Sequence, residues 1–320
     1  MAALGLRNAS APRTGRSALL QATIEEVGKV VLGKDQQVRL ALSGLLARGH
    51  VLIEDVPGVG KTTLAHVFAK ALGLDFQRIQ FTSDLLPGDV LGVSIFDQSR
   101  GEFRFQAGPV FTQLVLADEI NRATPKTQSA LLEAMEEGQV TLDGTTRQLP
   151  NPFFVIATQN PSSQLGTFPL PESQLDRFLI RLTLGYPTLD AERALLRGRD
   201  RRELVDLVEA RLRPEQLATF QDQVPDVHTS DALLDYIQKL LQFTRTSGDY
   251  RLGLSPRAGL ALLRVAQAWA MIDGRDHVIP EDVQAVVGAV VGHRLQLSHG
   301  GPNPNADALV ESLLTQVPVP

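Results

Sequence analysis

A glycine-rich stretch followed by a lysine and two threonines is the part of this sequence best suited to phosphate chemistry. It lies between a short apolar run, 50–53, and a segment with helical spacing, 64–72. A turn of this kind at a helix N-terminus directs backbone N–H groups at an anion, and glycines let the chain bend around it. Lys61 is expected to contact the β- and γ-phosphates, and the Thr62 hydroxyl to bind Mg²⁺. The predicted nucleotide-binding residues of this loop are Pro57, Gly58, Val59, Gly60, Lys61, Thr62 and Thr63.

Asp55 departs from the usual phosphate-loop pattern, because it stands where the first glycine of G-x-x-x-x-G-K-[ST] is expected. The position precedes the tightest part of the loop, so the change is compatible with phosphate binding. The alternative is an ordinary Gly/Pro turn with a solvated lysine. The strand, the helix and the run Lys61-Thr62-Thr63 are in register, which favours the phosphate loop.

Two carboxylates, Asp118 and Glu119, end another apolar run at 114–117. We expect Asp118 to hold Mg²⁺, directly or through water. Glu119 is expected to act as the general base that polarises the attacking water. The alternative is a strand that simply ends in acids at the surface. Together with Lys61 and Thr62, the pair predicts ATP hydrolysis with ATP and Mg²⁺ as the cofactors.

Three further polar residues follow or precede predicted elements. Asn160 follows the apolar run 153–157 and would orient the attacking water. Arg177 stands just before the run 178–184, where an arginine finger would stabilise charge on the transferred phosphoryl group. Arg257 opens a helix and would contact phosphate. The alternatives are an Asn-Pro turn, a surface Asp–Arg pair and a solvated arginine. The predicted catalytic residues are Lys61, Glu119, Asn160, Arg177 and Arg257.

Strands that alternate with helical patterns must position these residues. The predicted strands span 51–54, 76–81, 114–117, 153–157 and 178–184. Such alternation predicts an α/β fold with a doubly wound parallel five-stranded sheet, in which ligands bind at the carboxyl ends of the strands. Two segments, 94–105 and 139–149, have the polar turns of inserted β-hairpins.

The chain divides into three predicted parts. Residues 1–16 are predicted to be a flexible tail, 17–187 the nucleotide-binding α/β core, and 188–320 a smaller all-α lid domain. The core is expected to begin with a helix over 18–31. The tail has three arginines and no acid, as in a transit peptide, but a disordered tail is the simpler interpretation.

Composition places the chain among ordinary globular proteins. Its 320 residues are 43% hydrophobic and 21% charged, with a formal net charge of −5. The acidic balance argues against a dedicated nucleic-acid binder. The absence of cysteine excludes disulfides and thiolate metal sites. No apolar run approaches the ~20 residues that span a bilayer. We therefore predict a cytoplasmic protein without a membrane span.

Taken together, the motifs resemble those of an AAA+ ATPase. Walker A at 54–63 and Walker B at 114–119 are similar to the family pattern, with Asn160 as sensor 1, Arg177 as arginine finger and Arg257 as sensor 2. More narrowly, the chain resembles the MoxR family over roughly residues 20 to 300. The segments that carry this resemblance are 54–58, 80–87, 108–111, 118–123, 157–161 and 175–178.

The resemblance implies a fold, an assembly and partners. An AAA+ module is expected to work as a homo-oligomeric ring of six subunits, in which Arg177 reaches a neighbour's ATP. The hairpins resemble the helix-2 and pre-sensor-1 inserts of their clade, and Val31 lies in a segment similar to one that contacts adenine. The family implies a chaperone-like remodeller of protein clients that works beside a protein with a von Willebrand factor A domain.

Three other functions compete with this one. An AAA+ motor acting on nucleic acid keeps the ATPase, but the acidic charge argues against it. A small-molecule kinase does not explain Asn160, Arg177 and the helical lid together. A nucleotide-gated scaffold that hydrolyses ATP too slowly to matter does not explain the intact Glu119.

Overall fold

The structure is a computed structural model that describes residues 13–160, 166–198, 201–298 and 306–319. Its helices are α1 (Arg13–Gly28), α2 (Asp35–Leu46), α3 (Lys61–Ala71), α4 (Pro87–Leu91), η1 (Ile120–Arg122), α5 (Pro125–Glu137), α6 (Glu172–Leu175), α7 (Leu189–Arg197), α8 (Arg201–Asp206), α9 (Pro214–Gln223), η2 (Val224–Asp226), α10 (Asp231–Thr246), α11 (Pro256–Ile272), α12 (Pro280–Val291) and α13 (Ala306–Gln316). Its strands are β1 (His50–Glu54), β2 (Phe76–Gln80), β3 (Gly92–Asp97), β4 (Glu102–Ala107), β5 (Leu114–Asp118), β6 (Gln139–Leu142), β7 (Thr145–Gln148), β8 (Phe154–Gln159), β9 (Phe178–Leu182), β10 (Tyr250–Leu252) and β11 (Gln296–Leu297).

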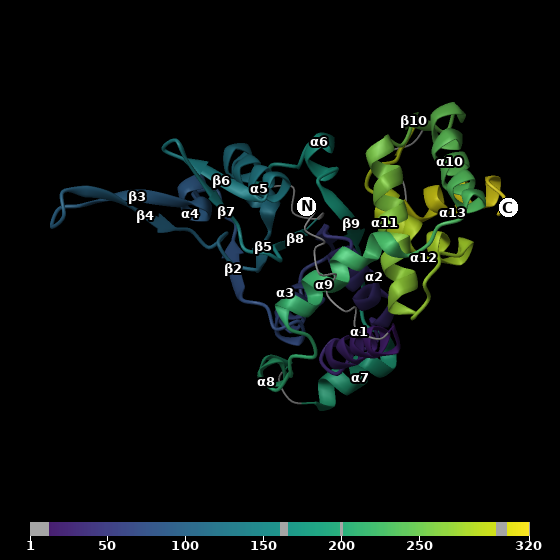
Figure 1. The fold of residues 1–320 in the computed structure, drawn as a ribbon, viewed down its shortest axis with the longest axis horizontal. Helices are drawn as coiled ribbons and strands as arrows, with labels where there is room; N and C mark the ends of the chain where they lie inside the picture. The colour runs from purple at the N-terminus through teal and green to yellow at the C-terminus, as the bar shows by residue number, and fades with distance from the viewer. Residues whose placement is uncertain (1–12, 161–165, 199–200, 299–305, 320) are drawn as a thin grey trace, which may run out of the picture.

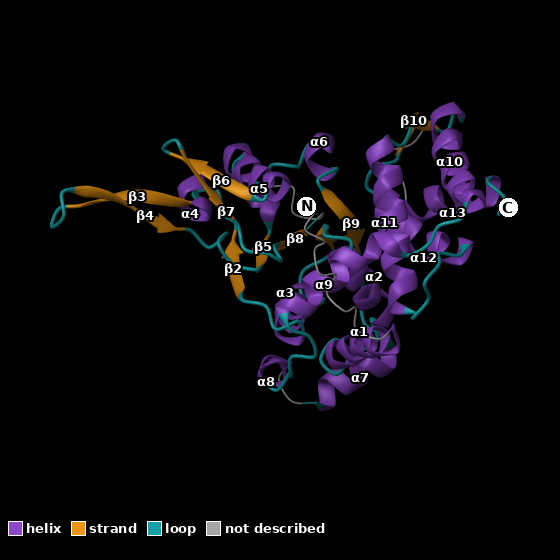
Figure 2. Ribbon diagram, viewed as in Figure 1, coloured by secondary structure: helices purple, strands orange, loops and turns teal. Residues whose placement is uncertain are grey.

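The predicted five-stranded parallel sheet is confirmed. Its order is β2-β5-β8-β1-β9, and every neighbouring pair is parallel. In Figure 2 the strands run through the middle of the molecule, with helices packed around them. Because the strands are parallel, the residues that follow β1, β5 and β8 all lie at one edge of the sheet.

Both faces of the central strands are buried, which is why these strands read as unbroken apolar runs. Alternate residues point to opposite faces. One face joins the larger core, shared with α1, α2, α3 and the lid helices, and its strand residues are Val51, Ile53, Leu114, Leu116, Phe154 and Ile156. The other face joins the smaller core around α5, and its strand residues are Leu52, Val115, Ala117, Val155 and Ala157.

Both predicted hairpins are present. β3 pairs with β4, and β6 pairs with β7, each in antiparallel register. Ser94 of the first hairpin donates a hydrogen bond to Asp143 of the second, and Arg147 lies over the ring of Phe105 at 3.9 Å. Figure 1 shows the two hairpins at one end of the molecule, with β3 and β4 extending farthest from the sheet. The hairpins therefore brace each other and form an arm.

The C-terminal helices α10 to α13 lie at the opposite end of the molecule (Figure 1). α11 packs against α12 and against α2, and α12 also packs against β9. This region includes a short antiparallel pair, β10 with β11, in addition to the predicted helices. α8 and α9 lack a strong sequence pattern and were not predicted.

Both ends of the first helix differ in position from the sequence prediction. α1 begins at Arg13 and ends at Gly28, whereas a helix over 18–31 was expected. Residues 1–12 of the predicted tail lie outside the described residues. The segment after residue 187 returns to the core, where Arg211 contacts Glu26 at 2.6 Å and Gln221 donates to the Leu45 carbonyl at 2.8 Å. The domain limits at 16 and 187 remain predictions.

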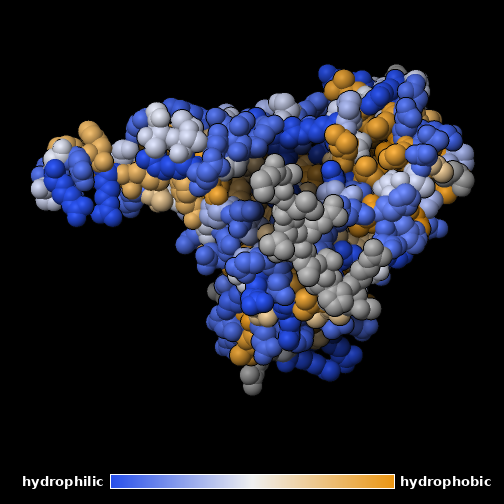
Figure 3. All heavy atoms as spheres, in the orientation of Figure 1, coloured by the Kyte–Doolittle hydropathy of each residue, from blue (hydrophilic) through white to orange (hydrophobic). Residues whose placement is uncertain are grey.

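One face of the molecule is mostly polar. In Figure 3 hydrophilic residues cover most of the visible face, while apolar residues show along the hairpin arm and between the lid helices. Within the described ranges, no helix combines the length and the apolar character needed to cross a membrane.

Candidate active site

The phosphate loop joins β1 to α3 at the carboxyl edge of the sheet. Gly58 and Gly60 have φ angles of 86° and 95°, in the left-handed region that other side chains rarely adopt. Space is not the constraint, because nothing lies within 4 Å of a Cβ built on either glycine. α3 begins immediately afterwards at Lys61, so its first N–H groups face the loop.

The Lys61 ammonium lies beside this loop. Its Nζ donates to the carbonyls of Asp55 at 2.6 Å and Val56 at 2.8 Å. Burial lowers the pKa of Lys61, while the negative charges of Asp55, Asp118 and Glu119 oppose that shift. The cation is thus held where an incoming phosphate would meet it.

The contacts of the Asp55 side chain account for an aspartate at the position where the motif has a glycine. Its carboxylate is buried and accepts two backbone hydrogen bonds, from Val56 N at 2.7 Å and from Gly185 N at 2.5 Å. Gly185 follows β9, so the carboxylate joins the start of the phosphate loop to the segment that leads into α7. A glycine at this position would supply neither contact.

The acidic end of β5 faces the loop. Thr62 Oγ1 lies 3.4 Å from Asp118 Oδ2, and Thr158 Oγ1 donates to Asp118 Oδ1 at 2.6 Å. A hydroxyl and a nearly buried carboxylate side by side are the hard oxygen donors that Mg²⁺ prefers. The residues therefore fit the predicted metal.

Glu119 occupies the turn after β5 in a left-handed conformation, with φ of 56°. Its N–H donates to Thr158 Oγ1 at 2.9 Å. Its carboxylate oxygen Oε2 accepts hydrogen bonds from Gln80 at 3.0 Å and from Arg122 at 2.8 Å. An unfavourable backbone angle at a functional position is a common feature of active sites.

Two residues of β2 were missed by the sequence analysis. Arg78 donates to Asp118 Oδ2 through Nε at 3.1 Å and through Nη2 at 2.7 Å. Gln80 binds Glu119, as described above. The edge strand β2 thus holds the carboxylate of Asp118 at the end of β5 and that of Glu119 in the following turn. Their signal in the sequence is weak: they are alternate polar residues on a short strand.

A cavity of about 750 Å³ brings most of the predicted residues together. Its lining is Pro57, Gly58, Gly60, Lys61, Thr62, Thr63, His66, Phe76, Arg78, Asp118, Glu119, Gln159, Asn160, Val205 and Asp206. Val59 and Val31 are not among these described lining residues, since both pack against the larger core. Asn160 follows β8 at the same edge as the loop, as expected. The His66 ring stacks on Phe76 at 4.9 Å, and burial lowers the pKa of His66.

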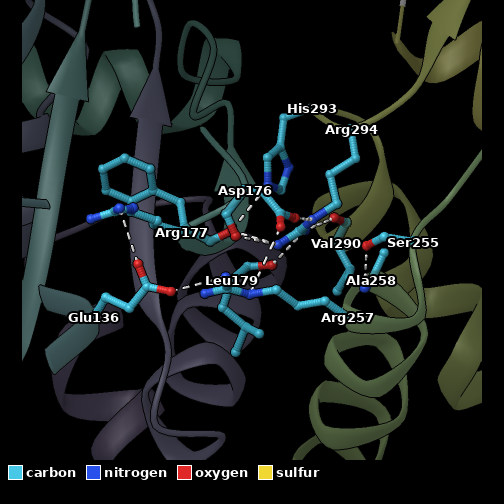
Figure 4. Close-up of polar contacts among 11 residues, drawn as sticks. Glu136, Asp176, Arg177, Leu179, Ser255, Arg257, Ala258, Val290, His293 and Arg294 are labelled. Atoms are coloured by element: carbon cyan, nitrogen blue, oxygen red, sulfur yellow. Dashed lines mark hydrogen bonds and ion pairs between the residues drawn. The ribbon is translucent and has the colours of Figure 1, made fainter. Parts of the chain in front are cut away.

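The predicted arginines Arg177 and Arg257 lie elsewhere. Arg177 contacts Glu136 at 3.1 Å, and Arg257 contacts the same carboxylate at 3.2 Å (Figure 4). They share the lining of a second cavity, of about 320 Å³, with Asp176 and Arg294. Arg177 precedes β9, whereas the phosphate loop follows β1. Since β9 and β1 are parallel neighbours, the two arginines and the loop lie at opposite edges of the sheet.

Comparison with known proteins agrees with this architecture. The model of the ATPase family associated with various cellular activities matches residues 50–180, and an AAA lid domain model matches residues 242–314. Chaperone MoxR1 of Mycobacterium tuberculosis is 41% identical over 309 residues, covering 93% of this chain and 79% of MoxR1. The chain belongs to the MoxR family of AAA+ ATPases.

Two further comparisons extend over almost the whole MoxR-family chain. The uncharacterized protein YeaC of Bacillus subtilis is 47% identical, covering 94% of this chain and 95% of YeaC. A crystal structure of a candidate ATPase from Cytophaga hutchinsonii is 37% identical with a TM-score of 0.84, covering 96% of this chain and 97% of that one. The predicted family and fold class are therefore confirmed, and the family supports ATP binding and ATPase activity.

Proposed function

We propose that this MoxR-family protein hydrolyses ATP to ADP and phosphate with Mg²⁺. Lys61 and the loop backbone would hold the β- and γ-phosphates, while Thr62 and Asp118 would hold the metal, which neutralises charge on the phosphates when bound. Glu119 would accept a proton from the attacking water, and Asn160 would orient that water. The assembly of these side chains around one cavity supports this assignment.

We propose further that the protein acts as a ring, with six subunits as the expected number. The observation that carries this proposal is the position of Arg177 at the amino end of β9, across the sheet from the phosphate loop. Five residues of strand span about 16 Å, which is too far for a side chain to cross. Arg177 would therefore serve a neighbour's nucleotide, and Arg257 beside it would contact the same phosphates. Val31 lies outside the described lining of the cavity, and the family resemblance is what supports its proposed contact with adenine.

The ring would remodel, assemble or activate protein complexes as a chaperone. The name of the relative MoxR1 supports the chaperone function. A protein with a von Willebrand factor A domain is the partner that we expect from the family resemblance. The formal net charge of −5 gives no support to nucleic acid as the substrate.

Mixed rings test this proposal. Lys61→Ala should abolish ATP binding, whereas Glu119→Gln should bind ATP without turnover. Arg177→Ala should bind ATP but lose hydrolysis. Mixing Arg177→Ala with Lys61→Ala should restore part of the activity, because an intact loop then meets an intact arginine from the next subunit.

Light scattering must show that the mixed rings form. If they form and no activity returns, Arg177 does not act between subunits. Unchanged ATP affinity in Lys61→Ala would contradict the phosphate site itself, and full turnover by Glu119→Gln would require a different base.

A further inference from the structure

Arg294, which follows α12, is buried against the segment that carries the predicted arginine finger, with only 7% of its side chain exposed. Its Nε donates to Asp176 Oδ1 at 2.6 Å, and its Nη2 donates to the carbonyls of Asp176 at 3.2 Å and Phe178 at 2.8 Å. Its Nη1 donates to the carbonyl of Leu179 at 3.1 Å and to that of Val290. One guanidinium therefore joins residues 176–179 to the last turn of α12.

His293 holds the same segment. Its Nε2 bonds to the carbonyl of Phe178 at 3.0 Å. Burial and the nearby positive charges of Arg294 and Arg181 lower the pKa of His293 well below its ordinary value. The ring is therefore neutral, and its Nε2–H is the donor that the carbonyl requires.

A chain of contacts leads from Arg294 to the finger (Figure 4). Asp176, which Arg294 binds, also lies 3.8 Å from Arg257 Nε, and Glu136 joins Arg257 to Arg177. The ion pairs of Glu136 are partly exposed, so they are weak and easily exchanged for a phosphate. The Arg294 contacts are buried, and their polar groups would be costly to leave unpaired.

We infer that Arg294 is a positioning residue that fixes the Arg177 segment to the end of α12. Movement of the lid helices would then move the arginine presented to the neighbouring subunit. This inference rests on the proposed function, because it assumes that Arg177 acts on a neighbour's ATP. The planar fork is essential, since a lysine ammonium cannot satisfy a carboxylate and several carbonyls in this geometry.

The test is the behaviour of Arg294→Lys in mixed rings. ATP affinity should stay within about twofold of wild type, because the phosphate loop is distant, while ATPase turnover should fall at least tenfold. Mixing with Lys61→Ala should restore activity, because the Arg294→Lys subunit still supplies an intact nucleotide cavity. Mixing with Arg177→Ala should not, because neither subunit then supplies a well-placed finger.

Arg275→Lys is the matched control. Arg275 binds Asp282 at 2.5 Å through each of its two terminal nitrogens, at the opposite end of α12. This variant loses a comparable fork in the lid without touching residues 176–179. It should lower the melting temperature and retain turnover, so a general loss of lid stability would not reproduce the Arg294→Lys pattern.

The outcomes separate the two proposals. If Arg177→Ala with Lys61→Ala restores activity but Arg294→Lys with Lys61→Ala does not, the Arg294 inference fails and the ring proposal stands. Wild-type turnover in Arg294→Lys would also overturn the Arg294 inference. If Arg177→Ala mixed with Lys61→Ala forms rings without activity, the ring proposal and the Arg294 inference both fail. Should Arg294→Lys not fold, Asp176→Asn must show the same pattern of rescue, and its absence would refute the inference.

Discussion

At the scale of single residues, the Arg78 guanidinium and the proposed Mg²⁺ would both bind the same carboxylate oxygen, Asp118 Oδ2. Asp118 Oδ2 accepts from Arg78 at 2.7 Å and lies near the Thr62 hydroxyl, where we propose that Mg²⁺ binds. Because a cation in this position would compete with the guanidinium for the same oxygen, Arg78 opposes metal entry. A released Arg78 would still line the cavity and face the phosphates.

Arg78→Met should therefore lower the Mg²⁺ concentration needed for half-maximal ATP binding. Losing this ion pair, whose arginine is half exposed, costs about 1 kcal/mol and corresponds to about a fivefold shift. Binding of a fluorescent ATP analogue, titrated with Mg²⁺, measures it. Arg122→Met is the control, because Arg122 binds Glu119 and not Asp118. An unchanged Mg²⁺ midpoint in Arg78→Met would show that no competition takes place.

The local sequence pattern was sufficient to select Lys61, Thr62 and Asp118 as candidates, because a loop, a helix start and a strand end are each determined by residues that are adjacent in the sequence. It was insufficient for Arg78 and Arg294. Arg78 meets Asp118 only because β2 pairs with β5, and Arg294 meets Asp176 across 118 positions of the chain. Such contacts depend on which elements become neighbours, and a single sequence does not state this.

At the scale of elements, the first hairpin has a packed base and an exposed end. Phe105 contacts the Phe111 ring at 5.6 Å and lies under Arg147, whereas Phe103 is 73% exposed and contacts the Phe96 ring at 5.2 Å. The base should therefore contribute to stability and the end should not.

Phe103→Ser should change the free energy of unfolding by no more than about 0.5 kcal/mol, as for other exposed positions. Phe105→Ala should cost about 1–2 kcal/mol, because it removes an aromatic contact and a cation–π contact. Urea unfolding of both variants measures the difference. Equal destabilisation would mean that the exposed end packs in solution.

Elements with a strong period were predicted to within a few residues, since apolar strands and capped helices are determined locally. β5 is an example, because the apolar run 114–117 predicts a strand that spans Leu114–Asp118 in the structure. The ends of α1 were misplaced, because the helix spans Arg13–Gly28 whereas 18–31 was expected. α9 was missed because its apolar face is short and packs against α2, a tertiary contact.

At the scale of the whole molecule, two neutral histidines, His50 buried and His293 half-buried, should make the fold sensitive to acid. His50 Nδ1 accepts from Val155 N at 3.0 Å, and its Nε2 bonds to the Met135 carbonyl at 3.1 Å. Burial lowers the pKa of His50 to about 4, and that of His293 well below its ordinary value. In the unfolded chain both would titrate near ~6.5.

The free energy of unfolding should therefore show no loss from these two histidines above about pH 6.5. Below that pH it should decrease as the pH falls, since the unfolded state then binds the additional protons. Each histidine contributes a slope of up to about 1.4 kcal/mol per pH unit, for His50 down to about pH 4. Urea unfolding between pH 7 and 4.5 measures it. His50→Gln, which keeps an acceptor and a donor without titrating, should show a shallower slope; an identical slope would assign the acid sensitivity elsewhere.

Ring assembly should appear as a dependence of activity on concentration. Because Arg177 and the phosphate loop lie at opposite edges of one sheet, a single subunit would lack a complete catalytic site. ATPase activity per subunit should rise with protein concentration and fall at least tenfold below the concentration at which rings dissociate. Light scattering of Glu119→Gln in ATP, which retains the nucleotide, should give the mass of a hexamer. A monomer with constant specific activity would instead require every catalytic group to come from one chain, and Arg177 would then have only its structural contact with Glu136.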